Sequence, residues 1–364
     1  MKIVTVVGAR PQFIKAAAMS RVLRRTHTEV LVHTGQHYDA QMSEVFFREL
    51  HIPKPDYDLG ISGGTHAQMT ARMLVAVEEV LLAEMPDALL VYGDTNSTLA
   101  AALAAAKLHV PVLHVEAGNR LGSLVNPEEV NRILTDHVAA MLFACVPSAM
   151  EQLRLENLAG RAWLVGDPML DAFRYYRGLD GGRAPKTLPG LDGEPVSVPE
   201  AFYYLTCHRE ENTRDDAPLT EILLAMESLP HPTFYPVHPR NRAAAIRLRQ
   251  ALGLQQVRFL QPLGYLESLA LVAHAQRVVT DSGGVQREAF FAGVPCVTVF
   301  DYAVWPETMV GGCNVLAAPN RADLLAKLET RPMWPTAESP FGDGHACEKI
   351  VGLLATDFPG GSVK

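Results

Sequence analysis

Short runs of apolar, often β-branched residues alternate with Ala/Leu-rich amphipathic stretches along the whole chain. In the first half the apolar runs, which we expect to be strands, are Lys2–Val7, Glu29–His33, Ala88–Tyr92, Val112–Val115, Met141–Cys145 and Trp163–Val165. In the second half they are Phe202–Thr206, Thr233–Val237, Arg258–Leu260, Arg277–Thr280, Pro295–Val299 and Asn314–Leu316. Helical patterns between them include Ile14–Arg25, Thr65–Ala83 and Ser97–Leu108. Strands that are apolar throughout and separated by helices are typical of a parallel sheet buried on both faces, so the pattern predicts an α/β fold.

A segment rich in glycine and proline, from Gly178 to Glu200, separates the two halves. Such a composition is typical of a linker or hinge. The length of 364 residues also suggests two domains, because domains commonly have about 100–200 residues. We therefore expect two doubly wound domains that face each other across a cleft.

The composition is that of an ordinary globular protein, with 48% hydrophobic and 20% charged residues. It excludes a disordered, collagen-like or coiled-coil chain. The formal net charge of −8 repels a phosphate backbone at long range, so no nucleic-acid partner is expected. A small basic pocket for one phosphorylated ligand remains compatible with that charge.

The apolar run that opens the chain stops at Gly8 and is followed by Arg10. It is too short for the core of a signal peptide or for a membrane span. The five cysteines show no CxxC spacing; they are Cys145, Cys207, Cys296, Cys313 and Cys347. We therefore expect a cytoplasmic protein with reduced thiols, without a disulfide framework, a zinc site or a membrane partner.

Polar and ionisable residues follow many of the predicted strands at the same end. The segments concerned are Gly8–Lys15, Gly93–Thr98, Glu116–Arg132, His208–Asn212, His238–Asn241 and Asp281–Glu288. Ligands of open parallel sheets bind beyond the carboxyl ends of the strands. Two rims of this kind predict an active site between the two domains.

The run Asp281-Ser282-Gly283-Gly284 leads from a predicted strand into a helix. Glycines let a phosphate approach the backbone N–H groups of a helix N-terminus, so a diphosphate would bind well there. Alternatively, Ser282 only caps the helix and Gly283 and Gly284 form a tight turn. Glu288, one turn further along, could accept hydrogen bonds from ribose hydroxyls, or it is simply a helix carboxylate.

Cationic side chains at the strand ends are candidates for binding phosphate. His208 and Arg209 follow a buried strand and could bind a diphosphate and assist its departure. His238, after the next strand, joins this candidate set, as do Arg10 and Lys15 after the first strand. The alternatives are a structural hydrogen-bonding role for a histidine at a strand end, and solubility for exposed cations.

Three carboxylates, Asp94, Glu116 and Glu128, lie in or beyond the loops that follow two neighbouring strand candidates. Paired carboxylates can divide acid and base roles when their environments separate their pKa values. Any one of them is alternatively a helix cap, and Asp94 before Thr95–Thr98 fits that alternative. Three such groups near one sheet edge favour the catalytic interpretation.

Several cofactor motifs are missing from the sequence. No GxGxxG follows the first strand and no acidic residue stands at the expected ribose position, so a nicotinamide cofactor is not expected. Neither GxxxxGK[ST] nor GxSxG occurs, and no His/Asp cluster suggests a metal centre. Asp56-Tyr57-Asp58 has the DxD form of metal-dependent sugar transferases, but it lies in a turn-like sequence without further ligands. We therefore expect neither a cofactor nor a metal.

Taken together, the polar motifs resemble those of the non-hydrolysing UDP-N-acetylglucosamine 2-epimerases. The match is collinear and covers nearly the whole chain. Its blocks are Gly8-Ala9-Arg10-Pro11-Gln12, Gln36-His37-Tyr38, Gly93-Asp94-Thr95, His114–Gly118, Pro127–Arg132, His208–Asn212, Asp281–Ala289, Trp305-Pro306-Glu307 and Phe341–Gly344.

The resemblance implies a fold like that of glycosyltransferase B, with two Rossmann-like domains around the substrate. It implies an N-terminal domain of residues 1–170 plus 345–364 that carries the sugar and the catalytic carboxylates. A hinge would follow at 171–200 and a UDP-binding domain at 201–344. The family eliminates UDP to give a glycal and adds it back with the opposite C2 configuration, without a cofactor.

Matched position by position, the resemblance implies acid/base roles for Asp94, Glu116 and Glu128, without deciding which of them removes the C2 proton. It places His208 near the departing diphosphate and Glu288 on the ribose. The implied diphosphate contacts are Arg10, Lys15, Arg132, Ser282 and Gly283. A homodimer and a role in cell-surface polysaccharide biosynthesis are implied as well.

The chain departs from the family pattern in three places. Gly8–Gln12 reads Gly-Ala-Arg-Pro-Gln where Gly-Thr-Arg-Pro-Glu is usual, a variant similar to the branch acting on UDP-2,3-diacetamido uronic acids. Asn119-Arg120 replaces Leu-Arg, and an unusual Leu121–Asn126 follows. Phe300–Val304 replaces Arg-Asp-x-Thr-Glu. The effector residues of some bacterial members are only partly matched, by Gln36, His37 and Arg72.

The sequence therefore predicts an isomerase that interconverts UDP-N-acetylglucosamine, or a close 2-acetamido relative, with its manno epimer. Three alternatives remain open: a hydrolysing 2-epimerase, a glycosyltransferase of the same fold, and a UDP-sugar sensor without activity.

Overall fold

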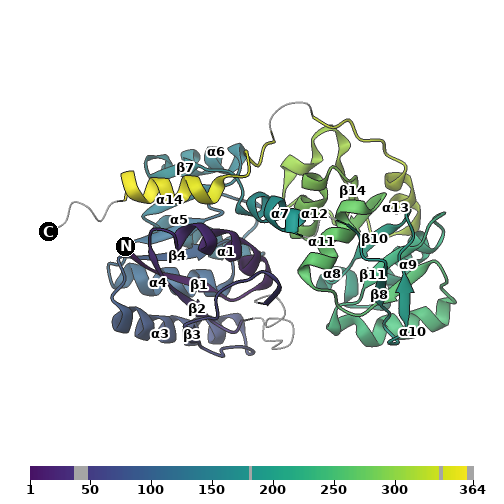
Figure 1. The fold of residues 1–364 in the computed structure, drawn as a ribbon, viewed down its shortest axis with the longest axis horizontal. Coiled ribbons are helices and arrows are strands. Elements are labelled where there is room, and N and C mark those ends of the chain that lie inside the picture. Colours follow the sequence, from purple (N-terminus) through teal and green to yellow (C-terminus); the bar gives the residue numbers. More distant parts are fainter. Residues whose placement is uncertain (37–47, 180–182, 336–338, 359–364) are drawn as a thin grey trace. The chain divides into compact units, whose positions relative to one another are not determined.

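The computed structural model describes residues 1–36, 48–179, 183–335 and 339–358, and the chain divides into two compact units. The first unit comprises Met1–Arg174 and Glu338–Lys364, and the second comprises Tyr175–Ala337. Each unit is built around a parallel sheet with helices in its crossover connections (Figure 1). Within the described residues, no helix is long and apolar enough to cross a membrane.

The first unit contains a seven-stranded sheet with the order β3-β2-β1-β4-β5-β6-β7, and every neighbouring pair in it is parallel. Its strands are β1 (Lys2–Val7), β2 (Thr28–His33), β3 (Tyr57–Asp58), β4 (Ala88–Tyr92), β5 (Val112–Val115), β6 (Met141–Ala144) and β7 (Ala162–Leu164). The chain order reverses between β1 and β4, the place where doubly wound sheets bind ligands.

Helices of the first unit connect these strands and cover the sheet. They are α1 (Arg10–Leu23), α3 (His66–Glu84), α4 (Asn96–Lys107), α5 (Pro127–Val138), α6 (Pro147–Leu155), η1 (Ala159–Arg161) and α14 (Ala346–Thr356). The last helix, α14, returns to this unit and packs against α1 (Figure 1). Its start is anchored by Asp171, whose carboxylate accepts hydrogen bonds from the backbone N–H groups of Ala346 and Cys347 at 3.1 and 2.8 Å.

The second unit contains a six-stranded parallel sheet with the order β12-β11-β10-β13-β14-β15. Its strands are β10 (Tyr203–Thr206), β11 (Thr233–Pro236), β12 (Val257–Leu260), β13 (Arg277–Thr280), β14 (Cys296–Val299) and β15 (Asn314–Ala317). Its helices are α8 (Glu210–Thr213), α9 (Asp216–Glu227), η2 (Pro239–Asn241), α10 (Arg242–Leu252), α11 (Tyr265–His274), α12 (Gly283–Ala292), η3 (Pro306–Gly312) and α13 (Arg321–Leu328). The order reverses between β10 and β13, so this unit repeats the doubly wound plan.

The predicted fold class is confirmed, because both sheets are parallel and both units are Rossmann-like. Every apolar run predicted as a strand is a strand in the structure, to within a residue at either end. The helix expected over Ile14–Arg25 begins earlier, at Arg10, because proline is tolerated in the first turn of a helix, where its missing N–H group costs no hydrogen bond.

The segment 171–200, expected as a hinge, carries regular structure. Helix α7 (Pro168–Leu179) covers its beginning, and β8 (Thr187–Pro189) and β9 (Pro195–Ser197) form an antiparallel pair. An antiparallel bridge from Gly190 to Leu260 joins this hairpin to the edge strand β12. Strands of three residues that contain proline leave no alternation for the sequence pattern to show.

A few of the predicted features fall outside the described residues. They are His37 and Tyr38 of the Gln36-His37-Tyr38 motif, residues 180–182 of the expected hinge, and residues 359–364 of the expected C-terminal return segment.

Candidate active site

Glu116 and Lys15 form a buried ion pair at the carboxyl edge of the first sheet. Lys15 lies on α1, just beyond β1, and Glu116 follows β5 directly. The Lys15 Nζ atom contacts the Glu116 carboxylate, and the two residues are 2% and 8% exposed. Burying either charge alone is costly, so each residue needs the other in this position.

The backbone around this pair is unusual. Glu116 has φ of +70°, in the left-handed region that a residue with a Cβ rarely adopts. Gly93, at the end of β4, also has a positive φ, and a Cβ added there would lie 3.4 Å from Glu116 Oε1 and 3.7 Å from Lys15 Nζ. Strain of this kind persists where the surroundings hold it in place, and it clusters at functional sites.

A second carboxylate–cation pair lies along the same edge. Arg132, on α5, contacts the Asp94 carboxylate at 2.5 Å and the Glu129 carboxylate at 2.8 Å. Burial opposes ionisation of the guanidinium, but Asp94 and Glu129 outweigh it and hold the pKa of Arg132 above its usual value. Asn131 adds a hydrogen bond from its side chain to the Asp94 carbonyl at 2.8 Å. Asp94 is thus bound to α5 through both its side chain and its backbone.

Glu128 stands in the first turn of α5 and is half-buried. The side chain of Asn126 caps this helix by accepting a hydrogen bond from the Glu128 N–H group at 2.9 Å. Glu129, its neighbour, accepts hydrogen bonds from the backbone N–H groups of Leu121 and Gly122 at 2.8 and 2.9 Å. The unusual Leu121–Asn126 segment is therefore attached at both ends to the start of α5.

Gln12, which departs from the family pattern, and Arg120, which follows the departing Asn119, both bind groups within the first unit. Gln12, in place of the usual glutamate, is 2% exposed; its Oε1 atom accepts from the Gly8 N–H group at 2.7 Å, and its amide donates to the Tyr92 carbonyl at 2.8 Å. Arg120 binds both carboxylate oxygens of Glu156, at 2.7 and 2.9 Å, and contacts Asp136 at 2.8 Å. Both side chains thus bind protein groups within the first unit.

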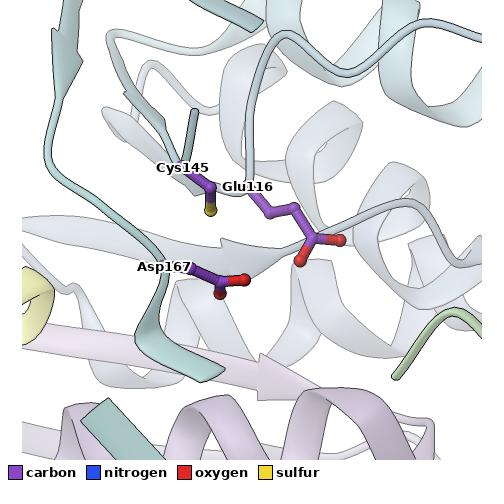
Figure 2. Close-up of side chains that lie close together, drawn as sticks. All are labelled: Glu116, Cys145 and Asp167. Carbon is purple, nitrogen blue, oxygen red and sulfur yellow. The ribbon is translucent and has the colours of Figure 1, made fainter. Parts of the chain in front are cut away.

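Two further side chains point toward Glu116 from neighbouring strands. Cys145 follows β6, Asp167 follows β7, and both are almost fully buried. Figure 2 shows the three side chains converging, and their ligand atoms lie within 4.8 Å of one another. Such spacing can hold a metal ion, but the Lys15 ammonium already neutralises Glu116, so we assign no metal to this group.

The two aspartates of Asp56-Tyr57-Asp58, which has the DxD form, contact residues of the neighbouring strand β2. Asp56 accepts a hydrogen bond from the Leu31 N–H group at 2.8 Å, and Asp58 lies 3.4 Å from the His33 side chain. Tyr57–Asp58 forms the edge strand β3. Both carboxylates thus attach this strand to β2.

The partly matched effector residues also have partners within the first unit. The Gln36 side chain accepts from the Ser97 N–H group at 3.0 Å and from the Ser97 hydroxyl at 2.7 Å. Arg72 donates to the carbonyls of Ser62 and Gly63 at 3.0 and 2.5 Å. In this structure they tie loops to α3 and α4.

In the second unit, Asp281 organises the loop that carries His208 and Arg209. Its Oδ2 atom accepts hydrogen bonds from the backbone N–H groups of both residues at 2.8 Å, and its Oδ1 atom lies 3.3 Å from His208 Nδ1. Asp281 is 2% exposed. The end of β13 therefore determines where the loop after β10 lies, and His238 stacks on His208 with ring centroids 5.8 Å apart.

Arg209 lies against Phe300–Val304, the segment that differs from the family pattern. Its guanidinium is over the Phe300 ring, 4.6 Å from the centroid, and donates to the Tyr302 hydroxyl at 3.3 Å. Phe300 and Tyr302 meet edge to face, with centroids 4.5 Å apart. The aromatic residues that replace the usual polar ones thus hold a phosphate-binding candidate in place.

The run Ser282-Gly283-Gly284 forms the start of α12. Ser282 caps the helix, accepting from the Val285 N–H group at 3.4 Å, so the capping alternative is observed. Capping satisfies one of the initial N–H groups of a helix and leaves the helix end favourable for an anion. Gly283 packs beneath Trp305, since an added Cβ would meet that ring at 3.6 Å.

Glu288 lies one turn into α12 and is 4% exposed. Burial raises the pKa of Glu288 to about 7, against a partly compensating hydrogen bond from Tyr265. Below about pH 7 this buried carboxyl group therefore carries a proton and no charge.

The structure thus gathers the candidates in two groups, one at each sheet edge. In the first unit, Arg10 and Lys15 begin α1, and Asp94, Glu116, Glu128 and Arg132 follow β4 and β5. In the second, His208, Arg209, His238, Ser282, Gly283, Gly284 and Glu288 follow β10, β11 and β13. Sequence reasoning gave no role to Asp167, Cys145, Glu129 or Asp281. All four lie next to the end of a buried strand or beside a candidate residue, and this position in the sequence could have identified them.

Comparisons with known proteins identify the family of the chain. The family model described as UDP-N-acetylglucosamine 2-epimerase matches residues 21–355. The chain is 45% identical over 366 residues to the UDP-2,3-diacetamido-2,3-dideoxy-D-glucuronate 2-epimerase of Pseudomonas aeruginosa, covering 98% of this chain and 99% of the relative. It is 36% identical to the UDP-N-acetylglucosamine 2-epimerase of Methanocaldococcus jannaschii, covering 97% and 99%.

Solved structures give the same result. The M. jannaschii enzyme in complex with UDP-GlcNAc and UDP aligns with a TM-score of 0.86 at 35% sequence identity, covering 98% of this chain and 99% of that one. UDP-GlcNAc 2-epimerase from Neisseria meningitidis bound to UDP-GlcNAc aligns with a TM-score of 0.80 at 25% identity, covering 98% and 100%. The expected resemblance is confirmed over nearly the whole length of the chain, and the chain belongs to the UDP-N-acetylglucosamine 2-epimerase family.

Proposed function

We propose that this chain is an isomerase that inverts C2 of a UDP-linked 2-acetamido sugar by eliminating UDP and adding it back. The observation that carries the proposal is the pair of ion-paired carboxylates at one sheet edge, Glu116 with Lys15 and Asp94 with Arg132. The named relatives, matched over almost their entire length, are 2-epimerases of UDP sugars.

The proposed reaction requires both carboxylates, which carry protons, and cations, which stabilise negative charge. The C2 proton of such a sugar has no adjacent carbonyl to acidify it, so a carboxylate must take it as the C1–O bond to UDP breaks. The electron pair of the C2–H bond forms the C1–C2 double bond of a glycal, and the electron pair of the C1–O bond leaves with UDP. Return of a proton to the opposite face of C2 and of UDP to C1 completes the inversion. Asp94, Glu116 and Glu128 are the proposed proton carriers.

The second unit supplies the groups that suit a nucleoside diphosphate. We assign the diphosphate to Arg209, His208, His238 and the start of α12, because cations and a helix N-terminus stabilise the negative charge of departing UDP. Arg10, Lys15 and Arg132 are the proposed substrate-binding cations of the first unit. Glu288 is the proposed acceptor for ribose hydroxyls. None of these roles requires a redox cofactor or a metal.

Two sugars are candidate substrates. UDP-N-acetylglucosamine is named for several relatives, whereas UDP-2,3-diacetamido-2,3-dideoxy-D-glucuronate is named for the relative with 45% identity. The Gly8–Gln12 variant of the first loop favours the second sugar. Incubation of the protein with each UDP sugar in deuterated water, followed by NMR of the products, tests both at once. We expect deuterium at C2 of a UDP-linked product, and faster incorporation from the diacetamido uronate.

The same experiment separates the alternatives. Free 2-acetamido-mannose sugar plus UDP would indicate a hydrolysing enzyme. Transfer of the sugar to an added acceptor with C2 unlabelled would indicate a glycosyltransferase. Tight UDP-sugar binding without any exchange would indicate a sensor.

We also propose that the protein acts as a cytoplasmic homodimer that supplies cell-surface polysaccharide synthesis. All five cysteines are buried and none is in a disulfide, which suits a reducing compartment. Val75, Leu82 and Met85 on and just after α3 are 54%, 61% and 81% exposed, which suits association of two copies. Light scattering of the purified protein tests the dimer; a monomeric mass at micromolar concentration contradicts it.

A further inference from the structure

Three adjacent strands bring Glu116, Cys145 and Asp167 to one point. Glu116 follows β5, Cys145 follows β6 and Asp167 follows β7, and these strands are neighbours in the sheet. Their side chains converge (Figure 2), with the carboxylate oxygens and the sulfur within 4.8 Å of one another. Cys145 and Asp167 are 1% and 0% exposed, so water does not screen the charges on this side of Glu116.

The titratable groups around Glu116 come from four elements. Lys15 of α1 is ion-paired with it, and Cys145 and Asp167 lie beside it. His114, on β5 itself, is hydrogen-bonded to Asp136 and to the Gly93 carbonyl, both at 2.7 Å. The groups beside Glu116 therefore include a second carboxylate, an ammonium and a thiol.

Two carboxylates at this separation affect each other strongly. A like charge a few ångströms away in a buried site makes a carboxylate hold its proton to higher pH, and a cation has the opposite effect. Lys15 favours the ionised form of Glu116, which is needed to take a proton. Asp167 favours the protonated form, which is needed to return one.

We infer that Asp167 is a positioning residue that sets how readily Glu116 takes up and releases the proton during C2 inversion. This inference rests on the proposed function and deepens it. The reaction is reversible, so a group that removes the C2 proton in one direction returns it in the other, and such a group needs similar free energies for its two protonation states. Lys15 alone would hold Glu116 in the ionised form. Asp167 offsets that effect from the buried side of the pair.

The variant Asp167→Asn tests this inference. Asparagine keeps the side-chain oxygen that accepts from the Met169 N–H group at 2.9 Å, so the start of α7 is preserved. The negative charge is lost, and Glu116 then ionises at lower pH. We expect the limb of the pH–rate profile that reports Glu116 to move down by about one pH unit or more, with kcat falling more than KM changes.

Asp171→Asn is the matched control. Asp171 is also a buried aspartate of α7, 4% exposed, but its carboxylate binds the start of α14. We expect this control to lower stability and leave the pH–rate profile in place. A profile that moves equally in both variants, or in neither, overturns the inference.

A second measurement does not depend on turnover. The side-chain carboxyl carbon of Glu116 is assigned by its absence in Glu116→Gln and titrated by ¹³C NMR in the wild type and in Asp167→Asn. The inference requires the titration midpoint to be lower in the variant, and an unchanged midpoint overturns it. If no UDP sugar shows C2 exchange in the wild type, the proposed function fails, while this titration still decides whether Asp167 controls Glu116.

Discussion

Gln12 donates a hydrogen bond from its side-chain amide to the backbone carbonyl of Tyr92 across 2.8 Å. The same amide reaches Thr95 and Thr98, and its oxygen accepts from the N–H groups of Gly8 and Ala9. One buried side chain therefore joins the ends of β1 and β4, where the loops with Arg10 and Asp94 begin. The glutamine that stands here in place of the family's usual glutamate therefore helps to position both segments from inside the unit.

We predict that Gln12→Glu destabilises the protein. A carboxylate cannot donate to the Tyr92 carbonyl, and its charge would be buried, at a cost of about 1–3 kcal/mol in the free energy of unfolding. Urea unfolding measures the effect. The matched control is Gln250→Glu, the same change at an exposed position of α10, which we expect to be neutral; equal stability of the two variants would contradict the prediction.

Replacing Asp94 by asparagine should abolish exchange at C2 while sparing UDP binding. Arg132 keeps its contact with Glu129, so the start of α5 stays in place. Loss of an acid/base group costs about 10²- to 10⁴-fold in rate. Deuterium incorporation and calorimetric titration with UDP measure the two effects.

Glu128→Gln should also abolish exchange at C2 while sparing UDP binding. The start of α5 should be preserved, because Asn126 caps this helix through the backbone of residue 128 and not through its side chain. Retained turnover in both Asp94→Asn and Glu128→Gln would overturn the assignment of these carboxylates.

Shortening Phe300 to leucine should weaken UDP binding. The Phe300 ring lies under the Arg209 guanidinium, and a cation–π contact of this kind contributes about 0.5–1.4 kcal/mol, or about two- to tenfold in the dissociation constant. Tyr302→Phe is the control, since it keeps the ring and removes only a 3.3 Å hydrogen bond. If Tyr302→Phe weakens UDP binding as much as Phe300→Leu does, the contact with the Phe300 ring has no greater role in positioning Arg209 than the hydrogen bond has.

The buried Glu288 makes stability depend on pH. Burial raises the pKa of Glu288 from 4.5 to about 7, so between these values the folded protein keeps a proton that the unfolded chain has released. This contribution to stability is complete below the lower value and is lost as pH rises through about 7. Relative to the wild type, Glu288→Gln should therefore gain stability as pH rises from about 5 to about 8, by up to about 3 kcal/mol.

Urea unfolding of the wild type and Glu288→Gln across that range checks the sign. Glu200→Gln, at an exposed position, is the control for the loss of one carboxylate. A stability difference between wild type and Glu288→Gln that is independent of pH would show that Glu288 is ionised in the folded protein throughout.

The sequence by itself determined the alternation of strands and helices, both parallel sheets and the ordered motifs of the family. Burial on both faces of a parallel sheet leaves continuous apolar runs, and ligand-binding residues collect just after them. These are local signals, readable without knowing which strand lies beside which. They missed β3, β8 and β9, because these strands of two or three residues contain an aspartate or a proline and form no apolar run.

Only the tertiary structure decided which polar groups meet. Lys15 pairs with Glu116 because the order of the sheet sets the end of β5 near the start of α1, and Asp94 meets Arg132 through the packing of α5. Asp167 and Cys145 reach Glu116 only because β5, β6 and β7 are neighbours. Hydrophobic periodicity records whether a residue is buried but not its partner across the fold. The electrostatic balance at Glu116 therefore depends on strand order, which local sequence patterns do not contain.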